Sequence, residues 1–308
     1  MLAITRGYDV GDPLRITLFA AGAAYFGALV ITDPHRGGRL RTLGIAAAVS
    51  IGLLILTVWL AQLSVWAAAA LLVVLMYLSY ALLAVSPRAA TVVFIGAITT
   101  FVSSNREIET GRIGWFVLAM AVGFAWLALW ESLLSPEGPA DDLDAHSAAT
   151  PSTSGGGLVK PTTALAIQAA VAAVAAGLVA ELMGNDQTLI VAWTAFLVIG
   201  ASAGASTRRA WGRLYATVFG AVAGVLIAAS VPDTAIWTIA VVAVGVFFTI
   251  FTAPVSYPAM VFWLNIALVP LFATDGLYFA LIRDKAVAAL IGGCVAAVVA
   301  LTVLPIRE

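Results

Sequence analysis

Charged residues are scarce in this sequence, where they make up only 10% of 308 residues and leave a net charge of −1. A soluble domain carries a much more charged surface, so the composition excludes an ordinary water-soluble globular protein. The small net charge provides no basic field that would attract nucleic acid, and we expect no nucleic-acid partner. The only two histidines, His35 and His146, lie far apart without ligand-like neighbours, so we expect no metal site.

A single cysteine, Cys294, excludes a disulfide within the chain, and we expect it to pack in the protein interior. The sequence has neither a Gly-rich phosphate loop nor a nucleophile–base arrangement. We therefore expect no cofactor, no ATP site and no enzyme. The first 15 residues lack the basic start and cleavage site of a signal peptide, so the first apolar run should be retained.

Apolar residues are abundant, at 62% of the chain, and they gather in repeated runs. Each run approaches the roughly 20 residues that a helix needs to cross the bilayer core. The sequence thus predicts an all-α, polytopic transmembrane helix bundle of about 11 helices. The predicted helices span residues 16–32, 40–60, 65–85, 89–102, 113–131, 162–181, 188–204, 212–230, 235–252, 258–273 and 286–304.

The composition changes sharply at residues 135–160, which hold an acidic stretch followed by threonine, serine, proline and three glycines. Such a segment cannot build a core and is typical of a flexible linker. It divides the predicted bundle into an N-terminal membrane half, 1–134, with about five helices and a C-terminal half, 161–308, with about six.

Short strings recur in the two halves. Gly38-Arg39-Leu40 and Gly212-Arg213-Leu214 each precede a helix of small residues, and Arg106-Glu107 and Arg283-Asp284 each precede the last helix of a half. This pattern predicts two repeat-like halves, and transporters built from repeats often place a pathway at the repeat interface. With eleven crossings, the distribution of arginine and lysine places the N-terminus outside and the C-terminus in the cytoplasm.

The segment from Trp193 to Gly224 resembles the fusaric acid resistance-like (FUSC) superfamily, which includes aromatic acid exporters and plant malate channels. The resemblance is carried by a Trp-Thr helix, a glycine-bearing loop, a basic pair, an Arg-Leu step and a Gly/Thr-rich helix. In this chain these are Trp193-Thr194, Gly204, Arg208-Arg209, Arg213-Leu214, Thr217, Gly220 and Gly224. The chain departs from the family pattern at Ala216, where a glycine is usual, and the large soluble domain of many members is reduced to the linker.

The basic cluster is the leading candidate for substrate binding. Arg208, Arg209 and Arg213, with Arg39 and Arg41 of the first half, either anchor short cytoplasmic loops or form a cationic mouth for carboxylates. The second interpretation rests on the paired donors of guanidinium groups, which match the geometry of a carboxylate. Both interpretations stay open at the level of sequence.

Further candidates lie within the predicted helices. Asn265 either makes an interhelical hydrogen bond or lines a pathway, and Trp193 and Trp263 either pack or stack on an aromatic substrate. The small residues around Gly200–Gly204 and Gly220–Gly224 favour close helix packing. Asp284, Arg283 and Glu107 are candidates for coupling to an ion gradient, the alternative being neutralised pairs at the membrane interface.

These features indicate a multi-pass inner-membrane transporter of a bacterium, an efflux protein that exports small organic or aromatic acids by using an ion gradient. The partners would be the lipid bilayer and a small anionic or aromatic solute. A homo-oligomer or an accessory envelope protein stays open. The alternatives are an anion channel of the malate-channel type and a membrane scaffold or assembly partner that transports nothing.

Overall fold

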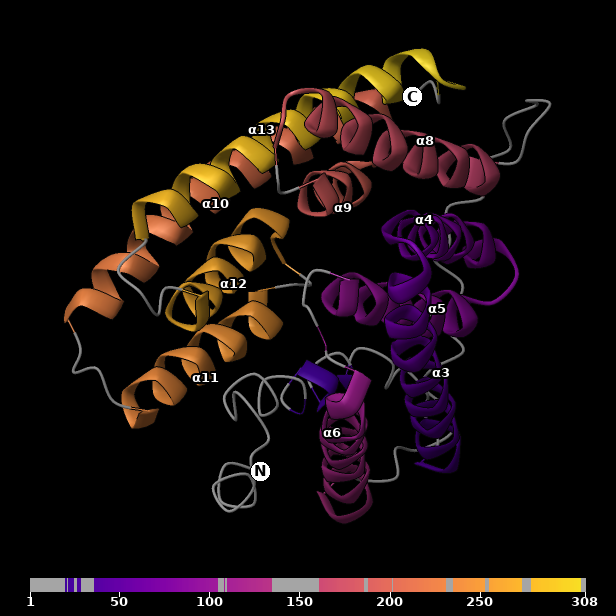
Figure 1. Cartoon of the computed structure of the whole chain (residues 1–308), viewed down its shortest axis with the longest axis vertical. Helices are drawn as coiled ribbons and strands as arrows, with labels where there is room; N and C mark the ends of the chain where they lie inside the picture. The colour runs from indigo at the N-terminus through magenta and orange to yellow at the C-terminus, as the bar shows by residue number, and fades with distance from the viewer. Residues whose placement is uncertain are drawn as a thin grey trace. The chain divides into compact units, whose positions relative to one another are not determined.

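The computed structural model is all-α, as the sequence predicts (Figure 1). It describes residues 20, 22–24, 27–28, 36–104, 108, 110–134, 161–185, 188–200, 202–230, 235–252, 255–272 and 278–305. The predicted linker, 135–160, and most of the predicted first helix lie outside the described residues. The chain divides into two compact units, Met1–Thr163 and Ala164–Glu308.

The first unit is a group of helices joined by short turns. Its elements are α3 (Arg36–Leu63), α4 (Val65–Ala81), the 3₁₀ turn η1 (Leu82–Ala84), α5 (Pro87–Ser104), the 3₁₀ turn η2 (Thr110–Arg112) and α6 (Ile113–Leu134). The break between α3 and α4 falls at Ser64, whose hydroxyl accepts a hydrogen bond from the amide of Trp66 at 3.2 Å. A serine in this N-cap position satisfies an amide that the new helix leaves unpaired.

Helix α3 organises the first unit, since it packs against α4, α5 and α6. Leu43 and Leu54 of α3 are buried with Met120 and Phe124 of α6. Between α3 and α5, Thr57 and Thr100 are fully buried and their hydroxyls lie 3.3 Å apart, close enough for a hydrogen bond. Apolar packing and one internal hydroxyl pair therefore hold these helices together.

The second unit contains α8 (Pro161–Leu182), α9 (Thr188–Val198), α10 (Ala203–Ser230), α11 (Ala235–Thr252), α12 (Tyr257–Phe272) and α13 (Tyr278–Thr302). Its long helix α10 packs against α12 and α13, while α11 lies beside α12 and α13 beside α9 (Figure 1). Gln168 of α8 is buried and donates to the carbonyls of Val303 and Leu304 at 2.7 and 3.0 Å. These two carbonyls follow the end of α13, where the backbone has no helical partner of its own.

Close helix contacts in the second unit depend on glycine, as the sequence predicts. A Cβ on Gly220 of α10 would lie 2.5 Å from the carbonyl oxygen of Phe262 on α12. A Cβ on Gly292 of α13 would lie 2.8 Å from the carbonyl oxygen of Val191 on α9. Both glycines let two backbones approach to a distance that no larger residue allows.

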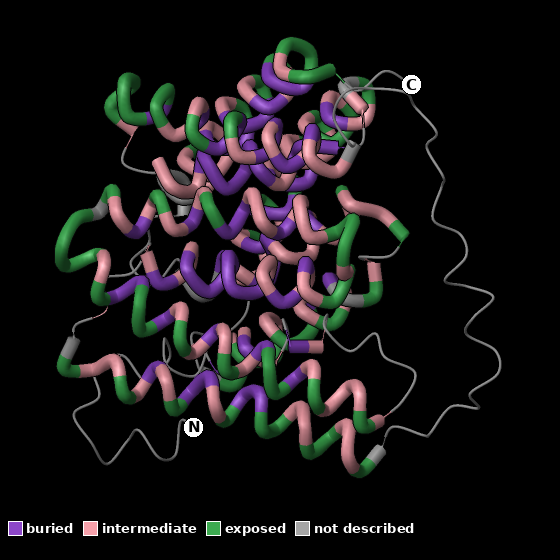
Figure 2. Tube along the Cα trace, turned by 90° about the vertical axis from the view of Figure 1, so that its right-hand side faces the viewer, coloured by how far each residue is buried: buried purple, intermediate pink, exposed green. Residues whose placement is uncertain are grey.

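Seven of the described helices are long and apolar enough to cross a membrane: α3, α4 with η1, α5, α6, α8, α10 and α13. Three shorter apolar helices, α9, α11 and α12, accompany them. Large apolar side chains such as Leu182, Ile236 and Phe251 are exposed, and exposed residues (green) alternate with buried ones (purple) along the helices in Figure 2. Surfaces of this kind are suited to lipid, so the protein is a multi-pass membrane protein. Cys294 is exposed on α13, and the expectation that it is buried is wrong.

Three helices begin earlier than hydropathy predicts. Helix α3 begins at Arg36 instead of residue 40, α10 at Ala203 instead of residue 212, and α13 at Tyr278 instead of residue 286. In each case the missed turns hold arginine, which is a good helix former even though it is not apolar. The predicted 89–102 run is a separate helix, α5, of 18 residues.

Candidate functional site

The basic run of the second unit follows a helix break. Helix α9 ends at Val198, and the hydroxyl of Ser202 accepts a hydrogen bond from the amide of Ala205 at 3.2 Å to start α10. The hydroxyl of Ser206 accepts from the amide of Gly200 at 2.9 Å, across the break. These hydrogen bonds satisfy the backbone where the helix is interrupted. Arg208, Arg209 and Arg213 consequently lie in the first three turns of α10, so the prediction that Arg208 and Arg209 lie between two helices is wrong.

Arg209 joins the two sides of this break. Its Nη1 donates to the carbonyl oxygen of Ile199 at 3.0 Å, so it satisfies a backbone acceptor just beyond the end of α9. Its guanidinium carbon also lies 6.0 Å from the centre of the Tyr257 ring, at the outer limit of a cation–π contact. Arg209 therefore has a structural task in addition to any role toward a ligand.

Arg213 lies one turn further along the same side of α10. Its Nη1 donates to the hydroxyl of Tyr257 at 2.9 Å. Its Nε is buried and has no hydrogen-bond partner among the described residues. The neighbouring Gly212 lies close to Pro258, to which an added Cβ would approach within 2.8 Å, so α10 and the first turn of α12 are in close contact at this point.

Tyr257 is thus shared by two of the three predicted arginines. It is the first residue of α12, and sequence reasoning missed it because no local pattern links it to residues 44 positions earlier. Arg208 and Arg209 are both exposed, and of the two it is Arg209 whose guanidinium lies near the Tyr257 ring. The site that the structure assembles is the set Arg209, Arg213 and Tyr257, called here the α10–α12 basic site.

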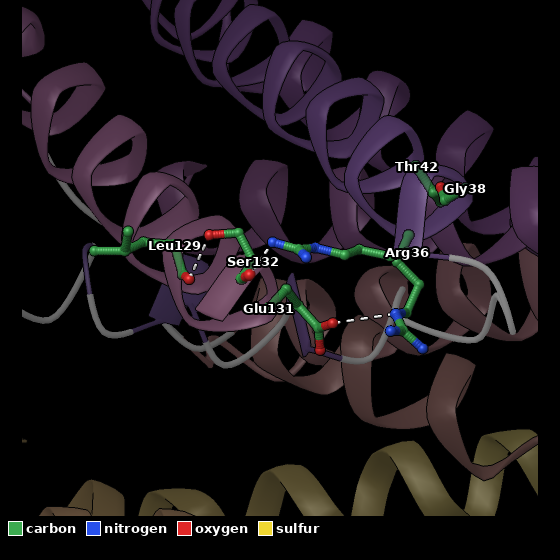
Figure 3. Close-up of polar contacts among 7 residues, drawn as sticks. Arg36, Gly38, Thr42, Leu129, Glu131 and Ser132 are labelled. Carbon is green, nitrogen blue, oxygen red and sulfur yellow. Dashed lines mark hydrogen bonds and ion pairs between the residues drawn. The ribbon is translucent and has the colours of Figure 1, made fainter. Parts of the chain in front are cut away.

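The corresponding arginines of the first unit have other surroundings. The Nε of Arg39 on α3 lies 3.1 Å from a carboxylate oxygen of Glu131 on α6, and each side chain is only 13% exposed. Arg36 donates to the carbonyl of Ser132, and Figure 3 shows both contacts at the end of α6. Arg41 is exposed. The Arg39–Glu131 pair ties α3 to α6 and neutralises the arginine.

Asn265 lies deeper along α12, two turns beyond Tyr257, and is buried. Its amide nitrogen donates to the carbonyl of Val261 at 2.8 Å, and its amide oxygen lies 3.4 Å from the Nζ of Lys285 on α13. An added Cβ on Gly220 of α10 would also meet Asn265, at 3.1 Å. The polar amide therefore links α12 to α13 at the seam with α10, and Lys285 is a further polar residue that sequence reasoning did not select.

The two candidate tryptophans pack against phenylalanines. Trp193 on α9 is buried, with its ring centre 5.3 Å from that of Phe196. Trp263 on α12 stacks on Phe248 of α11 at 4.5 Å and meets Phe262 edge-on at 5.4 Å. These contacts give both indoles a packing role in the second unit.

The predicted coupling residues differ in what surrounds them. Arg283 and Asp284 form an ion pair with each other at 3.0 Å and are partly exposed, with side-chain exposures of 65% and 36%. They lie inside α13, so their predicted position before the last helix is wrong. Glu107 lies outside the described residues.

Comparison with known families supports the resemblance found in the sequence. Residues 173–299 match the family model described as fusaric acid resistance protein-like, which is the region that contains the family-like segment of the sequence. The matched region contains the whole α10–α12 basic site as well as Asn265 and Lys285. No curated protein and no solved structure matches the chain.

Proposed function

We propose, from the premise that residues 173–299 match the fusaric acid resistance protein-like family model, that this protein is an inner-membrane exporter of small organic or aromatic acids driven by an ion gradient. The observation that carries the proposal is the convergence of Arg209 and Arg213 on Tyr257 beside the break between α9 and α10. Arg209 and Arg213 lie on α10, which is long and apolar enough to span a membrane, and Tyr257 lies on the shorter apolar helix α12.

A carboxylate that enters a membrane loses its hydration, and the loss must be compensated by fixed charges or donors. Two guanidinium groups supply the charge and several parallel N–H donors. The Tyr257 ring adds an aromatic face next to these donors, which favours a solute that joins a carboxylate to an aromatic ring. The site therefore combines the two chemical features of an aromatic acid.

The proposal also treats the two units as repeats of one design. In the first unit α3 packs against α5 and α6, and α4 packs against α5. In the second unit α10 packs against α12 and α13, and α11 packs against α12. Three helix contacts therefore recur in the same order along the chain, as a duplicated unit would leave them, and they support the proposal that the two units are repeats.

Flux measurements on proteoliposomes test the proposal. The purified chain is reconstituted, loaded with radiolabelled benzoate, and efflux is followed with and without a pH gradient. We expect saturable efflux that the gradient accelerates and that Arg213→Ala reduces at least about tenfold, since it removes a charged hydrogen-bonding group. Arg88→Ala, at an exposed arginine of α5, is the matched control and should transport like the wild type.

The same preparation distinguishes the alternatives. Ion currents with open-channel steps across a planar bilayer would support an anion channel instead of a carrier. Benzoate efflux no faster than from protein-free liposomes, with a correctly folded protein in the membrane, would contradict transport of this substrate class.

A further inference from the structure

Arg213 has an unsatisfied donor at a well-defined position. Its Nη1 donates to the Tyr257 hydroxyl, whereas its Nε is buried and has no acceptor among the described residues. A buried donor on a charged group that lacks an acceptor costs free energy, and native structures seldom leave one without a reason. An acceptor that arrives from outside the chain is the simplest such reason.

The chemistry of the missing acceptor follows from the shape of the guanidinium. Its Nε–H and one N–H of Nη2 point in parallel along the same edge, which is the edge that binds a carboxylate through two hydrogen bonds. Tyr257 occupies Nη1, away from that edge. Arg213 as a whole is only half-buried, so part of its side chain stays accessible although Nε is buried.

We infer that the Nε–Nη2 edge of Arg213 binds the carboxylate of the ligand side-on, while Tyr257 holds the guanidinium in the required orientation. The inference rests on the proposed function in taking the carboxylate to be that of the transported acid. Tyr257 is then a positioning residue and Arg213 is the binding residue.

Arg209 has a different task at the same site. Its Nη1 is engaged by the carbonyl of Ile199, which fixes it to the end of α9. Its charge lies near the Tyr257 ring, so Tyr257 has contacts with two cationic groups, Arg209 at the ring and Arg213 at the hydroxyl. This arrangement predicts that Arg209 contributes charge and local structure, and that two-point recognition of the carboxylate belongs to Arg213.

Lysine in place of Arg213 separates recognition by shape from attraction by charge. Arg213→Lys keeps the positive charge but has no parallel pair of donors. Equilibrium binding of radiolabelled benzoate to the purified full chain in an uncharged detergent gives the affinity. We expect Arg213→Lys to weaken binding about 10- to 100-fold and Tyr257→Phe to weaken it several-fold. Arg88→Lys is the matched control and should bind like the wild type.

Benzamide is the matched ligand, since it has the shape of benzoate without its charge and it should not compete. Tyr257→Phe removes only the hydroxyl that accepts from Arg213, so it keeps the inference testable if Arg213→Lys does not fold. Wild-type affinity in Arg213→Lys or in Tyr257→Phe would overturn the inference. Displacement of benzoate by benzamide, or binding of phosphatidylglycerol without any binding of benzoate, would also overturn it, because the site would then recognise the ring or a lipid phosphate.

The binding and flux measurements together distinguish failure of the inference from failure of the proposed function. Benzoate binding that depends on Arg213 without any benzoate efflux would keep the inference and contradict the proposed function. Efflux that is unchanged in Arg213→Lys would keep the proposed function and contradict the inference.

Discussion

Alanine at Gly220 is the substitution whose cost can be worked out most directly from the structure. The added Cβ would lie 2.5 Å from the carbonyl oxygen of Phe262, 3.0 Å from its Cα and 3.1 Å from the Cβ of Asn265. The first two atoms belong to the backbone of α12 and cannot rotate away. Gly220→Ala must therefore push α10 and α12 apart along the seam that also holds Tyr257.

The magnitude follows from two opposing terms. Forcing one extra methyl group into a packed contact costs about 1–3 kcal/mol. Alanine is a better helix former than glycine by about 1 kcal/mol, which offsets part of this cost. Because the clash is with backbone, we take the upper part of the range and expect a net loss of about 2 kcal/mol in the free energy of unfolding.

Thermal unfolding followed by tryptophan fluorescence in detergent measures this loss. The control is Gly52→Ala on α3, where an added Cβ would meet nothing within 4 Å. That variant should unfold at the wild-type temperature or slightly above it, because it gains helix propensity without a clash. Gly220→Ala should unfold roughly 4–8 °C lower, given the size of the chain. Equal midpoints for the two variants would refute the close packing of α10 on α12.

The remaining predictions concern polar contacts between helices, each measured as a change in unfolding midpoint. Arg39→Ala should lower the free energy of unfolding by about 3 kcal/mol, because Glu131 stays largely buried and loses its cationic partner. The double variant Arg39→Met with Glu131→Leu should recover most of that loss, because it removes both charges. Gln168→Leu should lower the free energy of unfolding by about 1–3 kcal/mol, because the carbonyls of Val303 and Leu304 lose their donor. An unchanged midpoint would contradict the capping role of Gln168. Asn265→Leu should destabilise by about 1–3 kcal/mol, and adding Lys285→Met should restore part of the loss, since the lysine no longer needs that acceptor.

The sequence predicts those features that are encoded locally. A run of about 20 apolar residues marks a membrane helix wherever it occurs, and the string around Arg208, Arg209 and Arg213 carries the resemblance to the family whose model residues 173–299 match. Hydropathy marks where a helix meets lipid, whereas the helix itself begins several residues earlier. The stretch between Ser202 and Arg213 is helical because a serine caps it and alanine and arginine favour helix, although it is not apolar.

Contacts between distant segments could not be predicted in the same way. Tyr257 meets Arg213 across 44 positions, and Asn265 meets Lys285 across 20. Each pair depends on how two helices are rotated against each other, and that rotation is decided by packing around Gly220 and its neighbours. A sequence contains the residues of such a pair but no periodic signal that joins them.

The two Gly-Arg-Leu strings show why the partner of an arginine matters more than the motif that contains it. Arg39 is paired with the carboxylate of Glu131, so that pair has no net charge to offer an anion. Arg213 is paired with a neutral phenol, and the positive charge of its guanidinium is not cancelled by Tyr257. An anion gains Coulomb energy only from a cation whose charge is not already balanced nearby. Of the two Gly-Arg-Leu strings, the second is therefore the one suited to attract a carboxylate, and the first is suited to hold α3 against α6.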